Sequence, residues 1–195
     1  MEELVAVKND LLKDLGLEEN YSNQQISALQ NGDSRYLKDI RINLKNALKS
    51  DHINEKEMAL LGLALANNAK NKVLMNFFKI KAEELNIESG QVAEAIACAS
   101  LLSSNNVLYR FRHFTGKEAY QKLPAKIKMN IMMKPAVGKE FFELLSLAVS
   151  AVNGCEMCVN AHEDSLIKMG TTEARIFDSI RLASVLNSVD RIFWD

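Results

Sequence analysis

The sequence predicts an all-α protein built from a duplicated helical unit, with two pseudo-repeats in one compact domain. Its 195 residues include only 2 Pro and 8 Gly, so few positions interrupt a helix. β-branched and aromatic residues rarely alternate with polar ones, which leaves no clear strand. A shift of 84 residues aligns 54–104 with 138–188 without a gap. Ten of these 51 pairs are identical, mostly at apolar positions with helical spacing.

The order of elements follows from this alignment. Residues 1–32 are predicted to be an N-terminal helical extension, with an apolar helix face formed by Val5, Leu11, Leu12 and Leu15. Residues 33–195 form the main domain. Each repeat is expected to contain three helices, near 55–70, 71–86 and 89–105 in the first and near 139–152, 155–169 and 172–187 in the second.

Composition narrows the class of function. Lys and Arg total 24 and Asp and Glu total 25, so the net charge of -1 gives no electrostatic case for a nucleic-acid partner. No apolar run approaches the roughly 18 residues of a membrane span, and the acidic start lacks the layout of a signal peptide. Three cysteines do not form a disulfide framework in a chain of this length. We therefore expect a soluble cytoplasmic protein whose cysteines do chemistry or bind a metal.

The candidate site lies in the second repeat, in the segment Asn153-Gly-Cys-Glu-Met-Cys-Val-Asn-Ala-His162. Asn-Gly ends one helix, so Cys155 lies at the start of the next, where unpaired N–H groups and the helix dipole favour a thiolate. Cys158 follows three residues later and His162 four residues after that, on the same helix face. The imidazole would take the proton of Cys158 or stabilise its thiolate. Glu143, on the preceding helix, is a candidate proton acceptor.

The two repeats differ at these positions. Glu143, Cys155, Cys158 and His162 align with Ala59, Asn71, Leu74 and Phe78, so only the second repeat would carry a site. Cys98 aligns with Leu182, an apolar position, and is predicted to be a buried core thiol without a function.

Three interpretations of the cysteine pair are open at this point: a redox dithiol, a zinc site or inert core thiols. Thioredoxin-like domains would need strands on both sides of the motif. Two thiolates, one imidazole and one carboxylate could form a tetrahedral zinc site. Structural zinc usually joins separate segments, however, whereas three of these ligands lie along one short helix. We therefore favour a redox pair without a bound metal.

The segment from Glu143 to Glu163 resembles the active-site motif of the alkylhydroperoxidase D (AhpD) family, in the carboxymuconolactone-decarboxylase-like superfamily. The spacing from Glu to the first Cys, the Cys-x-x-Cys and the His all coincide. Further similar segments are 36–44, 106–113 and 128–131, so the resemblance extends from about Ser34 to Val189. Met157 is a departure, because well-known members have a second His immediately before the second Cys, and its proton-transfer role has no counterpart here.

The resemblance implies an all-helical thiol peroxidase, usually a homotrimer, that reduces organic hydroperoxides. Cys158 would be the peroxidatic cysteine and Cys155 the resolving one, which gives a Cys155–Cys158 disulfide. His162 and Glu143 would move protons. No cofactor would be tightly bound, and dihydrolipoamide would supply electrons by thiol exchange. Implied partners are a peroxiredoxin of the alkyl hydroperoxide reductase C type and a lipoyl-bearing 2-oxoacid dehydrogenase subunit.

The order of the cysteines is open on physical grounds, because the dipole argument favours a Cys155 thiolate and the His162 argument favours Cys158. Two other functions are also open. The first is a dithiol electron-transfer adaptor without its own peroxidase turnover. The second is a non-redox carboxymuconolactone-decarboxylase-like enzyme, although decarboxylation has no evident need for a dithiol. Arg110 and Arg112 are expected at a subunit contact, or alternatively in an anion-binding role.

Overall fold

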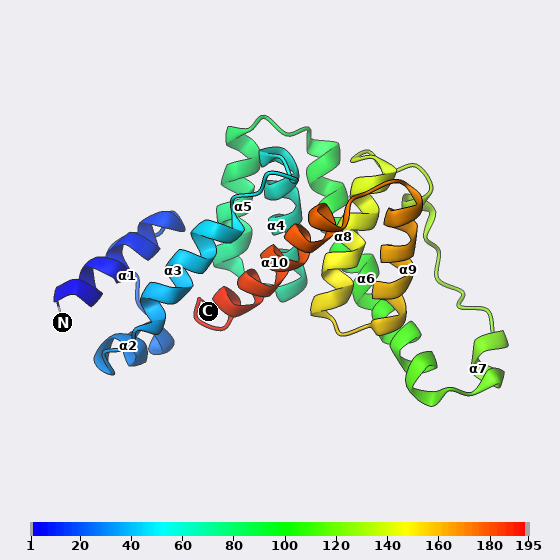
Figure 1. Ribbon diagram of the computed structural model, residues 1–195, viewed down its shortest axis with the longest axis horizontal. Coiled ribbons are helices and arrows are strands. Elements are labelled where there is room, and N and C mark those ends of the chain that lie inside the picture. The colour runs from blue at the N-terminus through cyan, green and yellow to red at the C-terminus, as the bar shows by residue number, and fades with distance from the viewer. Residues whose placement is uncertain (1, 194–195) are drawn as a thin grey trace.

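The computed structural model describes residues 2–193, and this part of the chain contains helices and no strand, so the all-α prediction is confirmed (Figure 1). The helices are α1 (Glu2–Asp14), α2 (Gln24–Asn31), α3 (Tyr36–Ala47), α4 (Glu55–Ala69), α5 (Lys72–Glu84), α6 (Ser89–Thr115), α7 (Glu118–Lys122), the 3-10 helix η1 (Asn130–Met132), α8 (Lys139–Val152), α9 (Glu156–Lys168) and α10 (Glu173–Asp190). Within the described residues, no helix combines the length and apolar character that crossing a bilayer requires.

The helix boundaries of the two repeats correspond to each other. Helices α4, α5 and α6 form the first copy, and α8, α9 and α10 form the second. Residues Lys72–Glu84 of α5 and Glu156–Lys168 of α9 are related by the same 84-residue shift that aligns the sequence. The shift also relates Ser89, the first residue of α6, to Glu173, the first residue of α10. The alignment therefore identified a structural repeat.

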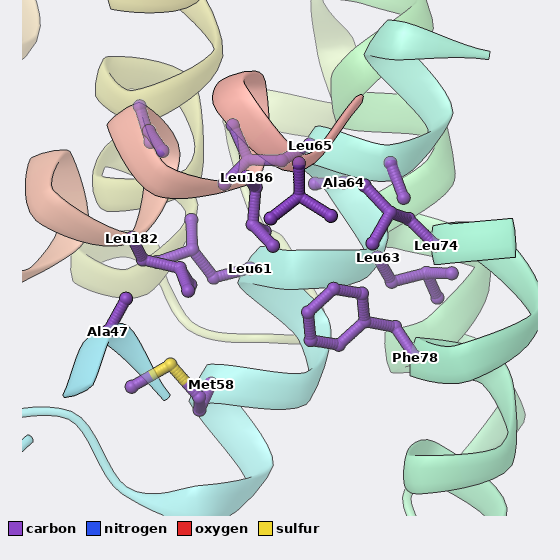
Figure 2. Close-up of a cluster of buried hydrophobic side chains, with 14 of the residues drawn as sticks. Ala47, Met58, Leu61, Leu63, Ala64, Leu65, Leu74, Phe78, Leu182 and Leu186 are labelled. Atoms are coloured by element: carbon purple, nitrogen blue, oxygen red, sulfur yellow. The ribbon is translucent and has the colours of Figure 1, made fainter. Parts of the chain in front are cut away.

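Helix α4 lies at the centre of the core and packs against α5, α6, α8 and α10. Figure 2 shows Leu61 of α4 beside Leu182 of α10, and the Phe78 ring of α5 next to α4. Gly62 allows this close approach, because a Cβ at that position would lie 2.2 Å from carbons of the Phe78 ring. Phe78 is fully buried, so the counterpart of His162 in the first repeat is a core residue.

Two equivalent carboxylates connect the repeats. Glu94 in α6 and Asp178 in α10 are related by the 84-residue shift, and each is 8% exposed. Glu94 accepts a hydrogen bond from the backbone N–H of Val137, just before α8. Asp178 accepts one from the hydroxyl of Ser50, just before α4. Each repeat thus anchors the loop that leads into the other, and this exchange orients α8 relative to α6.

A second connection is the ion-pair cluster around Arg175 of α10. Its guanidinium donates to both carboxylate oxygens of Glu57 in α4 and of Glu140 in α8, at 2.7–3.0 Å. The hydrogen bonds that Arg175 donates to Glu57 hold the pKa of Arg175 above its usual range. Burial alone would raise the pKa of Glu140, but hydrogen bonds from Arg175 and Thr171 outweigh it and lower that pKa.

The N-terminal extension contains two helices, α1 and α2, and α1 packs against α3. Leu11, Leu12 and Leu15 are buried in the core, as the apolar face predicted. Val5 lies in the same helix but is 40% exposed, so it is not part of this core. Arg41 of α3 forms ion pairs of 2.9 Å with Asp10 and Asp14 and holds α1 in place.

Candidate redox site

The candidate site begins at the turn between α8 and α9. Asn153 caps α8, and Gly154 has φ +67°, the left-handed conformation that glycine adopts without strain. The N–H of Cys155 bonds back to the carbonyl of Ser150 at 3.1 Å, which closes the turn. Helix α9 starts at Glu156, so Cys155 is its N-cap residue, at the helix start that the Asn-Gly pair predicted.

Cys155 and Cys158 are joined by a disulfide, with their Cα atoms 5.3 Å apart. One helical turn separates the two residues, which brings both sulfurs to the same end of α9. Cys155 is fully buried and Cys158 is 7% exposed. A reagent in solution therefore reaches the disulfide from the Cys158 side.

The first repeat shows what the N-cap position normally does. Asn71 is the N-cap of α5, and its side-chain oxygen accepts the N–H of Leu74 at 2.9 Å. In the second repeat, Cys155 replaces Asn71 and Cys158 replaces Leu74, and Cys155 makes no side-chain cap hydrogen bond. The disulfide therefore occupies the place of a helix cap. After reduction, the Cys155 sulfur would be positioned to accept the Cys158 N–H, which favours its thiolate.

His162 and Glu143 form a close pair beside the disulfide. The Nδ1 atom of His162 lies 2.6 Å from Oε2 of Glu143, and each side chain is only 12–13% exposed. His162 is on α9 one turn after Cys158, and Glu143 reaches it from α8. The structure thus joins Cys155 to Cys158 and Glu143 to His162, and helix α9 places His162 one turn after Cys158. In this oxidised arrangement the imidazole bonds to Glu143, and no thiol proton is present for it to accept.

An amide network behind the turn was missed by the sequence reasoning. Asn153 exchanges two hydrogen bonds with Asn68 at the end of α4, at 2.8 and 3.1 Å. It also donates to Asn106 of α6 at 2.8 Å, and Asn106 donates to Ser150. These contacts hold the turn before Cys155 against both α4 and α6. The Asn-Gly pair indicated a turn. No pattern in the sequence linked Asn153 to Asn106 or Asn68, which precede it by 47 and 85 positions.

The end of α6 also lies at the site. Arg110 donates to the carbonyl of Asn153, and Arg112 donates to the carbonyl of Leu123. His113 Nε2 lies 3.3 Å from a carboxylate oxygen of Glu156, the residue after Cys155. Both arginines thus have hydrogen-bond partners within the chain, and Arg110 belongs to the support of the Cys155 turn.

Cys98 is buried and unpaired, as its alignment with Leu182 predicted. Its sulfur lies 3.6 Å from the hydroxyl of Ser146 in α8. Burial raises the pKa of this thiol to about 12, so it stays protonated at neutral pH. Cys98 therefore provides an unreactive internal reference for the site cysteines.

The zinc interpretation requires two thiolates. Both site sulfurs are bonded to each other here, and within residues 2–193 no group of three or more His, Cys, Asp or Glu side chains is arranged to hold a metal ion.

Comparison with known proteins agrees with the motif. Residues 118–194 match the carboxymuconolactone decarboxylase family. Over 151 residues the chain is 38% identical to the alkyl hydroperoxide reductase AhpD of Anaeromyxobacter dehalogenans strain 2CP-C, a match that covers 77% of this chain and 81% of that protein. Over 160 residues it is 38% identical to the AhpD of Coxiella burnetii strain Dugway 5J108-111, with 80% and 90% covered. The family match includes the second repeat and the cysteine motif, and the two relatives match more than three quarters of the chain. The chain belongs to the AhpD family.

Proposed function

We propose that the protein is an alkyl hydroperoxide reductase that uses the Cys155–Cys158 dithiol and takes electrons from lipoyl groups. The observation that carries this proposal is the disulfide at the start of α9 with the His162–Glu143 pair one helical turn away. The similarity to proteins named alkyl hydroperoxide reductase AhpD supports the same reaction class.

In the proposed cycle, the Cys158 thiolate attacks the O–O bond of the hydroperoxide. The sulfur becomes a sulfenic acid, and the alkoxide leaves and takes a proton to become an alcohol. Cys155 then attacks the sulfenic sulfur, which releases water and forms the disulfide. The partial exposure of Cys158 and the complete burial of Cys155 support this order, because the peroxide must reach the attacking sulfur.

The His162–Glu143 pair would supply the proton steps. His162 accepts the Cys158 proton, which generates the thiolate, and returns a proton to the departing alkoxide. Glu143 accepts the Nδ1–H of the ring at 2.6 Å, which orients the ring and leaves Nε2 for the reacting groups. Met157 takes no part in this relay, since a thioether carries no exchangeable proton.

Two electrons then return the site to the dithiol. A thiolate of dihydrolipoamide attacks the disulfide and forms a mixed disulfide, and its second thiol displaces the remaining cysteine. The products are oxidised lipoamide and the reduced protein, so no bound cofactor is needed. A lipoyl-bearing 2-oxoacid dehydrogenase subunit would present this group in the cell, and a peroxiredoxin of the alkyl hydroperoxide reductase C type would be a second electron acceptor.

The test follows NADH loss with dihydrolipoamide dehydrogenase, lipoamide and cumene hydroperoxide. The wild type and the matched control Cys98→Ser should both turn over, whereas Cys158→Ser should be inactive. Cys155→Ser should accumulate a dimedone-reactive sulfenic acid on Cys158. Hydroperoxide consumption only after a peroxiredoxin is added would instead identify a dithiol electron-transfer adaptor. No reduction of the disulfide by dihydrolipoamide would contradict the lipoyl proposal.

A further inference from the structure

A cavity of about 340 Å³ lies in the first repeat, between the start of α4 and the end of α5. Its buried lining is apolar, because Met58, Ala59 and Phe78 are each no more than 6% exposed. The half-buried side chains of Leu48 and Leu85 complete the apolar walls. Small-molecule sites usually have volumes from about 300 Å³ upwards and are lined mainly by apolar side chains. The cavity therefore has the size and lining of a site for a small apolar ligand.

The 84-residue shift places this cavity at the counterpart of the His162–Glu143 pair. Ala59 corresponds to Glu143 and Phe78 corresponds to His162. In the second repeat, these two side chains meet at 2.6 Å and fill the space between their helices. In the first repeat, the side chain of Ala59 ends at its Cβ, and the Phe78 ring lies against Gly62. The loss of the carboxylate side chain thus leaves room between α4 and α5.

The rim of the cavity has three charged side chains, Glu55, Lys81 and Glu84, with a formal sum of -1. Lys81 is already paired, since its Nζ atom lies 3.6 Å from a carboxylate oxygen of Glu84 and 5.4 Å from the centre of the Phe77 ring. Glu55 forms no ion pair within residues 2–193. The unpaired charge at the mouth is therefore a carboxylate, which favours a ligand with one positive charge.

We propose that this cavity binds a small organic amine, with its apolar body between α4 and α5 and its ammonium group at the Glu55 carboxylate. The body packs on Met58 and the Phe78 ring, and the ammonium group stays at the solvent-exposed rim. Neither Cys155 nor Cys158 lines the cavity, so binding is independent of the proposed redox function. The position that forms the proton-transfer pair in the second repeat thus forms a binding site in the first.

The test compares three ligands of similar shape and different charge: 4-phenylbutylamine, 4-phenylbutanol and 4-phenylbutyrate. Methyl NMR spectra of protein labelled at its Met and Leu methyl groups report where each ligand binds. At low salt and pH 7 the amine should shift the signals of Met58 and Leu85 and leave that of Met157, beside Cys158, unchanged. The amine should bind about fivefold more tightly than the alcohol, as one exposed charge pair allows, and the carboxylate should bind more weakly than the alcohol.

Variants separate the charge from the cavity. Glu55→Gln should remove the preference for the amine over the alcohol and leave the affinity for the alcohol unchanged. Glu173→Gln is the matched control and should retain the preference, because Glu173 is likewise the first residue of its helix, α10. Ala59→Leu should abolish the binding of both ligands, since the larger side chain fills the cavity. Circular dichroism checks that each variant is folded, and the comparison at Glu55 decides the proposal if Ala59→Leu is not.

Two results would overturn the proposal. The first is the absence of shifts at Met58 and Leu85 with millimolar amine, and the second is a preference for the amine that persists in Glu55→Gln. Sedimentation velocity examines another occupant, a second copy of the chain. If the amine changes the oligomeric state of the wild type, the cavity is part of an interface between copies and the proposal is wrong. Binding at Met58 and Leu85 with an unchanged oligomeric state supports it.

Discussion

Cys155 occupies, at the start of α9, the N-cap position that Asn71 occupies at the start of α5. Asn71 caps the N–H of Leu74, and the counterpart of Leu74 is Cys158. Cys155 thus replaces the capping residue Asn71, and Cys158 replaces Leu74, the residue whose N–H is capped. The disulfide therefore lies where a side chain of the first repeat stabilises the start of its helix.

This relationship predicts a difference between two replacements of Cys155. Cys155→Ser and Cys155→Ala both remove the disulfide, but a serine hydroxyl can cap the N–H of Cys158 and alanine cannot. Cys155→Ser should therefore be more stable to unfolding by about 1 kcal/mol. Urea unfolding followed by circular dichroism measures this difference.

The matched control is the same pair of replacements at Cys158. That residue lies inside α9, where a serine side chain has no N-cap to form, so Cys158→Ser should gain nothing over Cys158→Ala. An equal gain at both positions would show that the effect of Cys155→Ser is unrelated to the cap.

The sequence predicted the fold where the signal was local or repeated. The 84-residue alignment located the starts of α5, α6, α9 and α10 because each repeat buries the same apolar stripes. Helix α6 continues to Thr115, ten residues beyond its expected end, because the first residue after 105 that stops a helix is Gly116, with φ +59°. The boundary taken from the repeat therefore missed this extension.

The reactive residues of the site could be predicted from the sequence, but the hydrogen bonds that hold the turn before Cys155 could not. Spacing along α9 placed Cys155, Cys158 and His162 together, since helical geometry fixes their common face. The amides of Asn68 and Asn106 meet Asn153 only through tertiary packing of α4 and α6 against α8. Such long-range polar contacts leave no periodic pattern in a single sequence.

A second prediction concerns the close approach of Gly62 and Phe78. Gly62→Ala should destabilise the protein by about 1–3 kcal/mol, because the new methyl group would overlap the Phe78 ring. Phe78→Leu should reduce the cost of Gly62→Ala, since the smaller side chain leaves room. Thermal unfolding of both single variants and the double variant gives the coupling, and strict additivity would contradict the proposed overlap.

Replacement of Phe78 also tests whether the first repeat is purely structural. Phe78→Ala should lower the free energy of unfolding by about 2–5 kcal/mol, as expected for a buried aromatic side chain. The folded fraction should still form and reduce the Cys155–Cys158 disulfide at the wild-type rate. Unchanged melting with lost redox activity would mean that this repeat contributes to the site.

The Arg175 cluster predicts a pH-dependent stability. The lowered pKa of Glu140 means that its carboxylate stabilises the folded state above the pKa of the unfolded chain, about 4.5, and that this contribution is lost as the pH falls towards the folded-state value. Glu140→Gln should be less stable than the wild type at pH 7, and the difference should shrink below about pH 4.5.

Urea unfolding between pH 3.5 and 7 measures this trend, and Glu19→Gln is the control because Glu19 is exposed and has no ion pair within the described residues. A stability difference for Glu140→Gln that stays constant across the range would show that its carboxylate titrates at its ordinary pKa in the folded protein.

The last prediction concerns His162 as a proton-transfer group. In the reduced protein, His162→Gln should raise the pH at which Cys158 reacts with iodoacetamide, because the imidazole no longer accepts the thiol proton. Turnover should fall by about 100-fold or more, the usual contribution of a general base. Mass spectrometry reports labelling at each cysteine, and Cys98 should remain unlabelled throughout the titration because of its raised pKa. Asp164→Asn, on the same helix, controls for the loss of a polar group and should leave the titration unchanged.

Glu143→Gln should shift the titration in the same direction as His162→Gln, since Glu143 holds the ring through the 2.6 Å hydrogen bond. Because both residues act on one proton path, the double variant should lose less activity than the product of the two single losses. Wild-type labelling and turnover in His162→Gln would place the proton path on another residue.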